Sequence, residues 1–203
     1  EAKSYILFRF QRTERRNAIN SIVADAEDEG LKPILKKISS DYTSVEYSLL
    51  LLSDKFKSFC KDDMKQADKL SALVKAAVEM TTQEAPNWEF IAARLLSYKL
   101  NRSIAAFEES VSVHSFYDKL RYLTDERLYG EYILAFYSPE EIAQAATFIK
   151  EERNDLLNYS GLDLLMKRYL IRTYSNKPIE SIQEMYLGIA LHLAINEKED
   201  RML

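Results

Sequence analysis

Residues 85–100 read Ala-Pro-Asn-Trp-Glu-Phe-Ile-Ala-Ala-Arg-Leu-Leu-Ser-Tyr-Lys-Leu. Pro86 suits the first turn of a helix, where its missing N–H costs no hydrogen bond. Apolar residues then recur at the three- and four-residue spacing of one helix face, from Trp88 through Ile91 to Leu95. We expect a long helix from here to about Phe107, and this stretch favours a mainly helical fold.

The composition supports the same fold class. Only four Gly and four Pro occur in 203 residues, whereas average usage would give roughly three times as many. This scarcity excludes collagen-like, linker-like and turn-rich all-β chains. The hydrophobic share of 47% is enough for one compact domain, or two small ones, with a buried core.

Charge, cysteine and histidine content exclude several functions. With 28 basic and 32 acidic residues the net charge is −4, so the basic excess of a duplex-binding protein is missing and we expect no nucleic-acid partner. One cysteine, Cys60, permits neither an intrachain disulfide nor a cysteine zinc site. His114 and His192 are too far apart for a HExxH motif, and we expect no metal site. Apolar runs such as Leu49–Leu52 are far shorter than a membrane span, so we expect a cytoplasmic protein.

Further helices are predicted on both sides of the central one. Sequences typical of capping boxes begin at Thr43, Ser138 and Ser181, and Gly30 fits the residue just after a helix end. The predicted ranges are 17–29, 33–39, 44–59, 69–83, 114–123, 125–136, 139–150, 161–168 and 181–196.

Two short β-ribbons are also predicted. Residues 4–10 are β-branched and aromatic, and a polar stretch follows to residue 16, which favours a strand or hairpin. Residues 169–172 and 179–180 flank a turn at Ser175–Pro178 and predict a second, late ribbon.

No self-sufficient active site is visible. Nucleotide loops, nucleophile elbows and metal-ligand spacings are missing. Adjacent carboxylates such as Glu108-Glu109, Asp62-Asp63 and Glu140-Glu141 point about 100° apart on a helix, so they are interpreted as solvated faces or as helix-start charges that suit the helix dipole. Cys60 is interpreted as an inert thiol, although Lys57 and Lys61 could lower its pKa.

A basic cluster lies near the start of the chain, at Arg9, Arg12, Arg15 and Arg16. It could attract an anion such as a nucleoside triphosphate. The alternative is an exposed ribbon with no ligand.

Residues 68–196 carry an ordered set of motifs. Ala76-Ala77, Ala85-Pro86 and Ala92-Ala93-Arg94-Leu95 stand in one register. Further blocks follow in order at Tyr117-Asp118, Tyr137–Ile142, Phe148–Asn154, Tyr159–Leu162, Lys167–Leu170 and Glu180–Tyr186. This set resembles the N-terminal helical region of class I ribonucleotide reductase large subunits.

The resemblance implies an enzyme that reduces ribonucleotides to deoxyribonucleotides by radical chemistry. In that family a ten-stranded α/β barrel carries the catalytic cysteines, and a separate small subunit carries a metal-radical cofactor. We expect this chain to support the barrel, in cis or as a split chain, and to be inactive alone. We expect the whole enzyme to be a homo-oligomer.

The first residues faintly resemble the ATP cone of some family members. The resemblance divides the chain into a cone-like region, 1–65, and a helical domain, 66–203. It also implies an ATP or dATP effector site at Arg9, Glu14, Asn17 and Arg102, although the family's tight-turn glycine is missing. Two alternatives stay open: a regulatory nucleotide-binding module, and a free-standing helical interaction protein.

Overall fold

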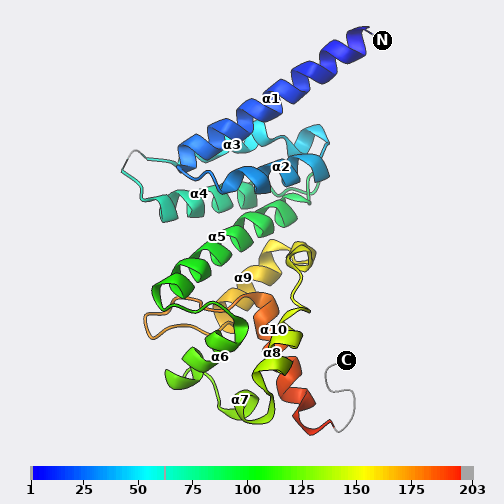
Figure 1. Ribbon diagram of the computed structural model, residues 1–203. Coiled ribbons are helices and arrows are strands. Elements are labelled where there is room, and N and C mark those ends of the chain that lie inside the picture. Colours follow the sequence, from blue (N-terminus) through cyan, green and yellow to red (C-terminus); the bar gives the residue numbers. More distant parts are fainter. Residues whose placement is uncertain (1, 62, 198–203) are drawn as a thin grey trace. The chain divides into compact units, whose positions relative to one another are not determined.

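The computed structural model describes residues 2–61 and 63–197 and confirms a mainly helical fold (Figure 1). The α-helices are α1 (Ala2–Ala26), α2 (Leu31–Asp41), α3 (Leu49–Phe59), α4 (Gln66–Glu79), α5 (Trp88–Ser110), α6 (Phe116–Asp125), α7 (Tyr132–Phe136), α8 (Pro139–Ala146), α9 (Tyr159–Arg168) and α10 (Ile182–Leu193). Short 3-10 helices are η1 (Val45–Tyr47), η2 (Glu151–Leu156) and η3 (Ala194–Asn196).

The chain divides into two compact units. The first comprises Glu1–Lys99 with Leu157–Ser160, and the second comprises Leu100–Leu156 with Gly161–Leu203. Helices α5 and α9 contribute residues to both. The predicted boundary between residues 65 and 66 separates a cone-like region from a helical domain by family resemblance. It does not describe compact units, and it stays a prediction.

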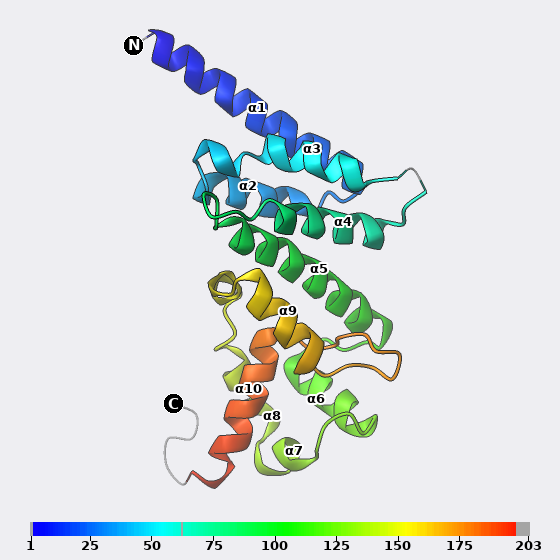
Figure 2. The same ribbon diagram turned by 180° about the vertical axis from the view of Figure 1, so that it is seen from behind.

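The first unit is built around α1, which packs against α2, α3 and α4. Its second half supplies buried residues from Ala18 to Ala26, while its first half extends past the neighbouring helices (Figures 1 and 2). Trp88 is 1% exposed and donates from Nε1 to the carbonyl oxygen of Glu46 at 2.9 Å. The long helix predicted from Trp88 is therefore anchored in this core.

The N-terminal ribbon predicted over residues 4–16 is wrong, because these residues lie within α1. An isolated two-stranded ribbon is marginal in water, whereas a helix that has already formed extends by one hydrogen bond per added residue. Arg, Gln and Glu in this stretch are good helix formers. The aromatic and β-branched residues before them simply continue the same helix.

The turn after α1 also differs from expectation. Glu27, rather than Gly30, adopts the left-handed conformation at the helix end, with φ 54°. Gly30 is the N-cap of α2 with an ordinary φ of −64°. A Cβ there would collide with the Tyr98 hydroxyl unless the tyrosine side chain moved, so a glycine suits this close approach.

The second unit has its own core, formed mainly by α6, α7, α8 and α10. Leu120, Ile133, Tyr137, Ile142 and Leu191 are buried together, each at most 4% exposed. The Tyr137 hydroxyl donates to the carbonyl oxygen of Leu191 at 2.8 Å, so the buried phenol is paired.

The late ribbon is reduced to one antiparallel bridge, between Arg172 and Pro178. Two backbone hydrogen bonds flank it, from Thr173 to Lys177 and from Ile179 to Ile171. Pro178 has no N–H to extend the ladder. The described residues at 169–180 therefore form a hairpin without strands.

Candidate functional site

The four residues predicted as an effector site do not form one cluster in the first unit. Arg9, Glu14 and Asn17 lie on α1, whereas Arg102 lies on the part of α5 that belongs to the second unit. Arg9 lines a groove between α1 and α2, and Glu14 lines a different, smaller cavity. Asn17 is exposed and lines neither. The nucleotide site stays a prediction.

The groove between α1 and α2, here called the basic groove, has a volume of about 1000 Å³. It is lined by Arg9, Arg12, Thr13, Arg15, Arg16, Ile19, Asn20, Lys32, Lys36, Ser39 and Ser40. Six of these residues are cationic and none is acidic. The arrangement can bind an anion.

Helix geometry explains how these cations gather. Arg9, Arg12 and Arg16 are spaced by three and four residues, so one face of α1 carries all three. Lys32 and Lys36 are likewise one turn apart on α2. The four-residue spacing of Lys32 and Lys36 is visible in the sequence, but a ribbon at residues 4–16 would not place them beside Arg9, whereas the helix α1 does.

A cavity of about 220 Å³ adjoins the basic groove and shares Arg15 and Ser39 with it. The Arg15 guanidinium donates to the carbonyl oxygen of Thr43 at 3.4 Å. Tyr42 and Ser44, which both carry hydroxyl groups, also line this cavity. Its wall mixes hydroxyl-bearing residues with the aliphatic Val45, Leu49 and Leu50, and Arg15 is the one cation among its lining residues.

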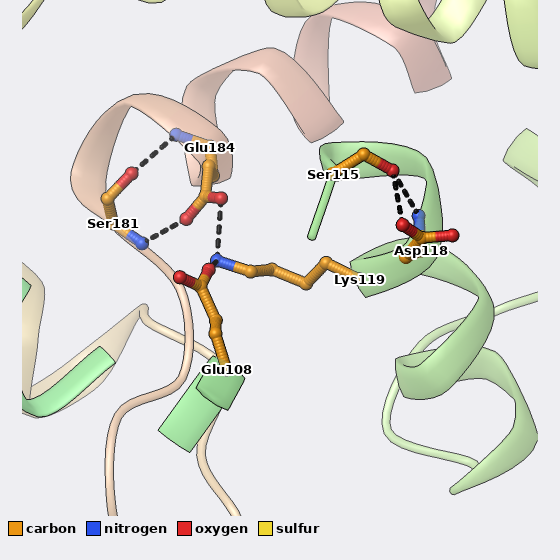
Figure 3. A network of polar contacts seen from close by, with 6 residues as sticks. All are labelled: Glu108, Ser115, Asp118, Lys119, Ser181 and Glu184. Atoms are coloured by element: carbon orange, nitrogen blue, oxygen red, sulfur yellow. Dashed lines mark hydrogen bonds and ion pairs between the residues drawn. The ribbon is translucent and has the colours of Figure 1, made fainter. Parts of the chain in front are cut away.

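A network of ion pairs and hydrogen bonds around a buried lysine links three helices of the second unit (Figure 3). Lys119 on α6 is 2% exposed, and its Nζ donates to Glu184 Oε1 of α10 at 2.6 Å and pairs with Glu108 of α5. Glu184 also accepts from the Ser181 backbone N–H at 2.6 Å. Glu108 was interpreted as a solvated or helix-start charge; its side chain keeps 30% exposure but also pairs with the buried ammonium of Lys119. The network joins three helices, and its polar atoms satisfy one another.

Glu180 is a second buried carboxyl group beside this network. It is 5% exposed and its Oε1 accepts from the Ile171 N–H at 2.7 Å, at the base of the hairpin. Burial, with a smaller contribution from the charge of Glu184, raises the pKa of Glu180 to about 7. A carboxyl group that titrates near neutrality therefore lies under the hairpin.

Other candidate chemistry is limited. Burial and then the charge of Asp25 raise the pKa of the Cys60 thiol, which supports its interpretation as inert.

Within the described part of the chain, no three His, Cys, Asp or Glu side chains are arranged to hold a metal ion. None of its helices combines the length and apolar character that a membrane crossing needs.

Helix α10 carries an exposed apolar stripe. Tyr186, Ile189 and Leu193 recur at three- and four-residue spacing and are 52%, 50% and 72% exposed. Other positions of the same helix, Met185 and Leu191, are buried in the core. Apolar residues aligned on an exposed helix face are typical of an interaction surface.

Comparison with known proteins gives a consistent result. A family model described as "Ribonucleotide reductase, all-alpha domain" matches residues 155–203. The ribonucleoside-diphosphate reductase subunit alpha of Treponema pallidum is 46% identical over 202 residues, which covers 100% of this chain and 24% of that protein. The corresponding subunit of Enterobacteria phage T4 is 30% identical over 190 residues, with 91% of this chain and 24% of the relative covered.

A third relative, ribonucleoside-diphosphate reductase 1 subunit alpha of Escherichia coli, is 28% identical over 143 residues, covering 70% of this chain and 18% of that protein. The chain thus spans about a quarter or less of the length of these relatives. The resemblance found in the ordered motifs is confirmed. The chain belongs to the ribonucleotide reductase family and corresponds to an N-terminal region of the large, or alpha, subunit.

Proposed function

We propose that this chain serves in a ribonucleoside-diphosphate reductase, an oxidoreductase that makes deoxyribonucleotides for DNA synthesis, and that it supports the catalytic barrel of the large subunit. The observation that carries the proposal is the similarity over 100% of the chain to the Treponema pallidum alpha subunit. The proposed setting is the cytoplasm, in a homo-oligomeric enzyme.

In this proposal the redox chemistry belongs to other parts of the enzyme. The chain holds a single thiol, Cys60, whose pKa is raised, and a lone thiol cannot form the dithiol pair that supplies two electrons. The barrel would supply the reacting cysteines, a small subunit the metal-radical cofactor, and a separate dithiol the reducing equivalents. The 203-residue chain alone would be inactive.

The stripe Tyr186, Ile189 and Leu193 is the proposed docking face for the remainder of the large subunit. The Lys119 network holds the first turn of α10 through Glu184, so the stripe is presented on a fixed helix. Burying three such side chains would stabilise docking by several kcal/mol, at roughly 25 cal/mol per Å² of apolar surface.

The test uses this chain together with the remainder of the same subunit, expressed separately. We expect the two to co-elute in gel filtration and to restore ribonucleotide reduction when the small subunit and a dithiol are added. Ile189→Lys/Leu193→Lys should abolish co-elution. The control Val45→Lys/Leu50→Lys changes two exposed apolar residues of the first unit, 83% and 44% exposed, and should co-elute as the wild type does. Equal behaviour of both variants would refute this docking face.

A second candidate function is a regulatory nucleotide-binding module. The basic groove favours it, because Arg9 lies there among five other cations. Saturable dATP binding that weakens in Arg9→Ala and in Arg102→Ala would support the predicted effector site. Binding of dATP that neither substitution changes would exclude it.

A further inference from the structure

The basic groove concentrates positive charge in an otherwise acidic chain. Six cationic side chains line it and no carboxylate does, whereas the net charge of the whole chain is −4. Among the described residues, no hydrogen bond or ion pair engages Arg12, Arg16 or Lys36. Lys32, by contrast, pairs with Glu29 at 3.8 Å. Like charges gathered with few counter-charges raise the local potential and attract an anionic partner.

The lining of the groove indicates which kind of anion it fits. Small-molecule sites are mostly apolar with a few polar groups, but Ile19 is the single apolar residue among the groove's lining residues. None of these lining residues is aromatic, so no ring among them can stack on a base. The lining instead follows α1 from Arg9 to Asn20, about 16 Å at 1.5 Å per residue. An elongated ligand recognised through its charges matches this surface.

Arginine content favours a protein partner among elongated anions. Four of the six cations are arginine, the charged residue most enriched in protein interfaces and able to bind carboxylates through two parallel hydrogen bonds. A long nucleic acid would extend beyond the groove onto a net acidic surface. A short acidic peptide would not.

We propose that the basic groove docks an acidic polypeptide segment, with carboxylates pairing with Arg12, Arg16 and Lys36. This is independent of the support role proposed for α10. The groove lies on α1 and α2 of the first unit, whereas the stripe lies in the second, so substitutions can separate the two.

The probe is a fluorescein-labelled peptide of alternating Glu and Ser, about ten residues long, titrated with the 203-residue chain in an anisotropy assay. Arg12→Glu/Arg16→Glu should weaken binding by about tenfold or more. The control Arg121→Glu/Arg168→Glu makes the same charge change at exposed arginines of the second unit and should change the affinity by less than about twofold. A matching Gln-Ser peptide should not bind.

Three outcomes would overturn the proposal. The first is equal weakening by both double variants, which would show a response to net charge alone. The second is no saturable binding of the Glu-Ser peptide by the wild-type chain when circular dichroism shows it folded. The third is tighter binding of ATP or inorganic triphosphate, which would assign the groove to a phosphate ligand.

Discussion

At the scale of single residues, Lys119 shows how charge is accommodated inside the second unit. Its ammonium group is 2% exposed and contacts carboxylates from two other helices. Replacing Lys119 would leave two largely buried carboxylates, 30% and 13% exposed, without their counter-charge, which costs far more than the pair contributes when intact. The network therefore makes three helices depend on one side chain.

Lys119→Met tests that dependence. We expect a loss of about 3–5 kcal/mol in the free energy of unfolding, because Glu108 and Glu184 would keep their charges without Lys119. The control is Lys167→Met, which removes an exposed pair with Asp163 at 2.7 Å and should cost less than about 1 kcal/mol. Urea denaturation followed by circular dichroism measures both. Similar costs for the two variants would show that burial does not strengthen the network.

The raised pKa of Glu180 predicts how the free energy of unfolding changes with pH. Its pKa rises from 4.5 to about 7 on folding, so the folded chain holds this proton more tightly than the unfolded chain. The stability from proton binding is complete below about pH 4.5 and is lost as the pH rises to about 7, a change of about 3 kcal/mol.

In Glu180→Gln the side chain at residue 180 is neutral at every pH, so the variant should not show this loss of stability with rising pH. The stability of the variant relative to wild type should increase between pH 5 and pH 7 and then level off, as measured by urea denaturation at several pH values. Glu184, Lys119 and Tyr129 are the charged or titratable groups that interact with Glu180, and none is altered. Glu152→Gln, at an exposed glutamate, should run parallel to wild type. A parallel profile for Glu180→Gln would contradict the interpretation.

At the scale of helices, the sequence predicted helix starts correctly where a side chain caps the backbone N–H groups of its own first turn. Ser138 and Ser181 form complete capping boxes with Glu141 and Glu184, and α8 and α10 begin where the pattern placed them. The third predicted box, at Thr43, was less accurate. Ser44 makes no side-chain cap, and α3 begins after Ser48, whose hydroxyl accepts from the Leu50 N–H at 3.3 Å.

The failures occurred where the outcome depends on partners distant in the sequence. Tyr5–Phe10 has strand-like composition, but no second strand pairs with it among the described residues, and it continues α1. The basic groove likewise needs Lys32 and Lys36 from α2, which no local pattern joins to Arg9. The role of Glu108 required Lys119 and Glu184 to meet from other helices.

Thr13→Pro tests whether residues before the first buried position form a helix. Proline removes the backbone N–H of residue 13 and clashes with the preceding turn. We expect the helical signal of the first turns of α1 to decrease in far-ultraviolet circular dichroism. The urea midpoint should stay nearly unchanged, because Ala18 is the first buried residue among those whose side chains the structure describes. Thr13→Ala is the control, and an unchanged helical signal in Thr13→Pro would contradict a helix there.

At the scale of the whole chain, the division into two compact units predicts two unfolding transitions. The first unit contains the single tryptophan, Trp88, buried at 1% exposure, so its fluorescence reports that unit. The second unit has a core of its own residues around Ile133. Circular dichroism reports both units, because both are helical.

Core substitutions should therefore separate the two signals. Phe56→Ala, in the first unit, should lower the urea midpoint of tryptophan fluorescence by an amount equivalent to about 3–5 kcal/mol, because it opens a large cavity. Ile133→Ala should destabilise the second unit by about 2–5 kcal/mol. It should shift only part of the circular dichroism transition and leave the fluorescence midpoint in place. If either substitution shifts both signals equally, the units unfold as one cooperative structure, because independent units would respond only to their own cavities.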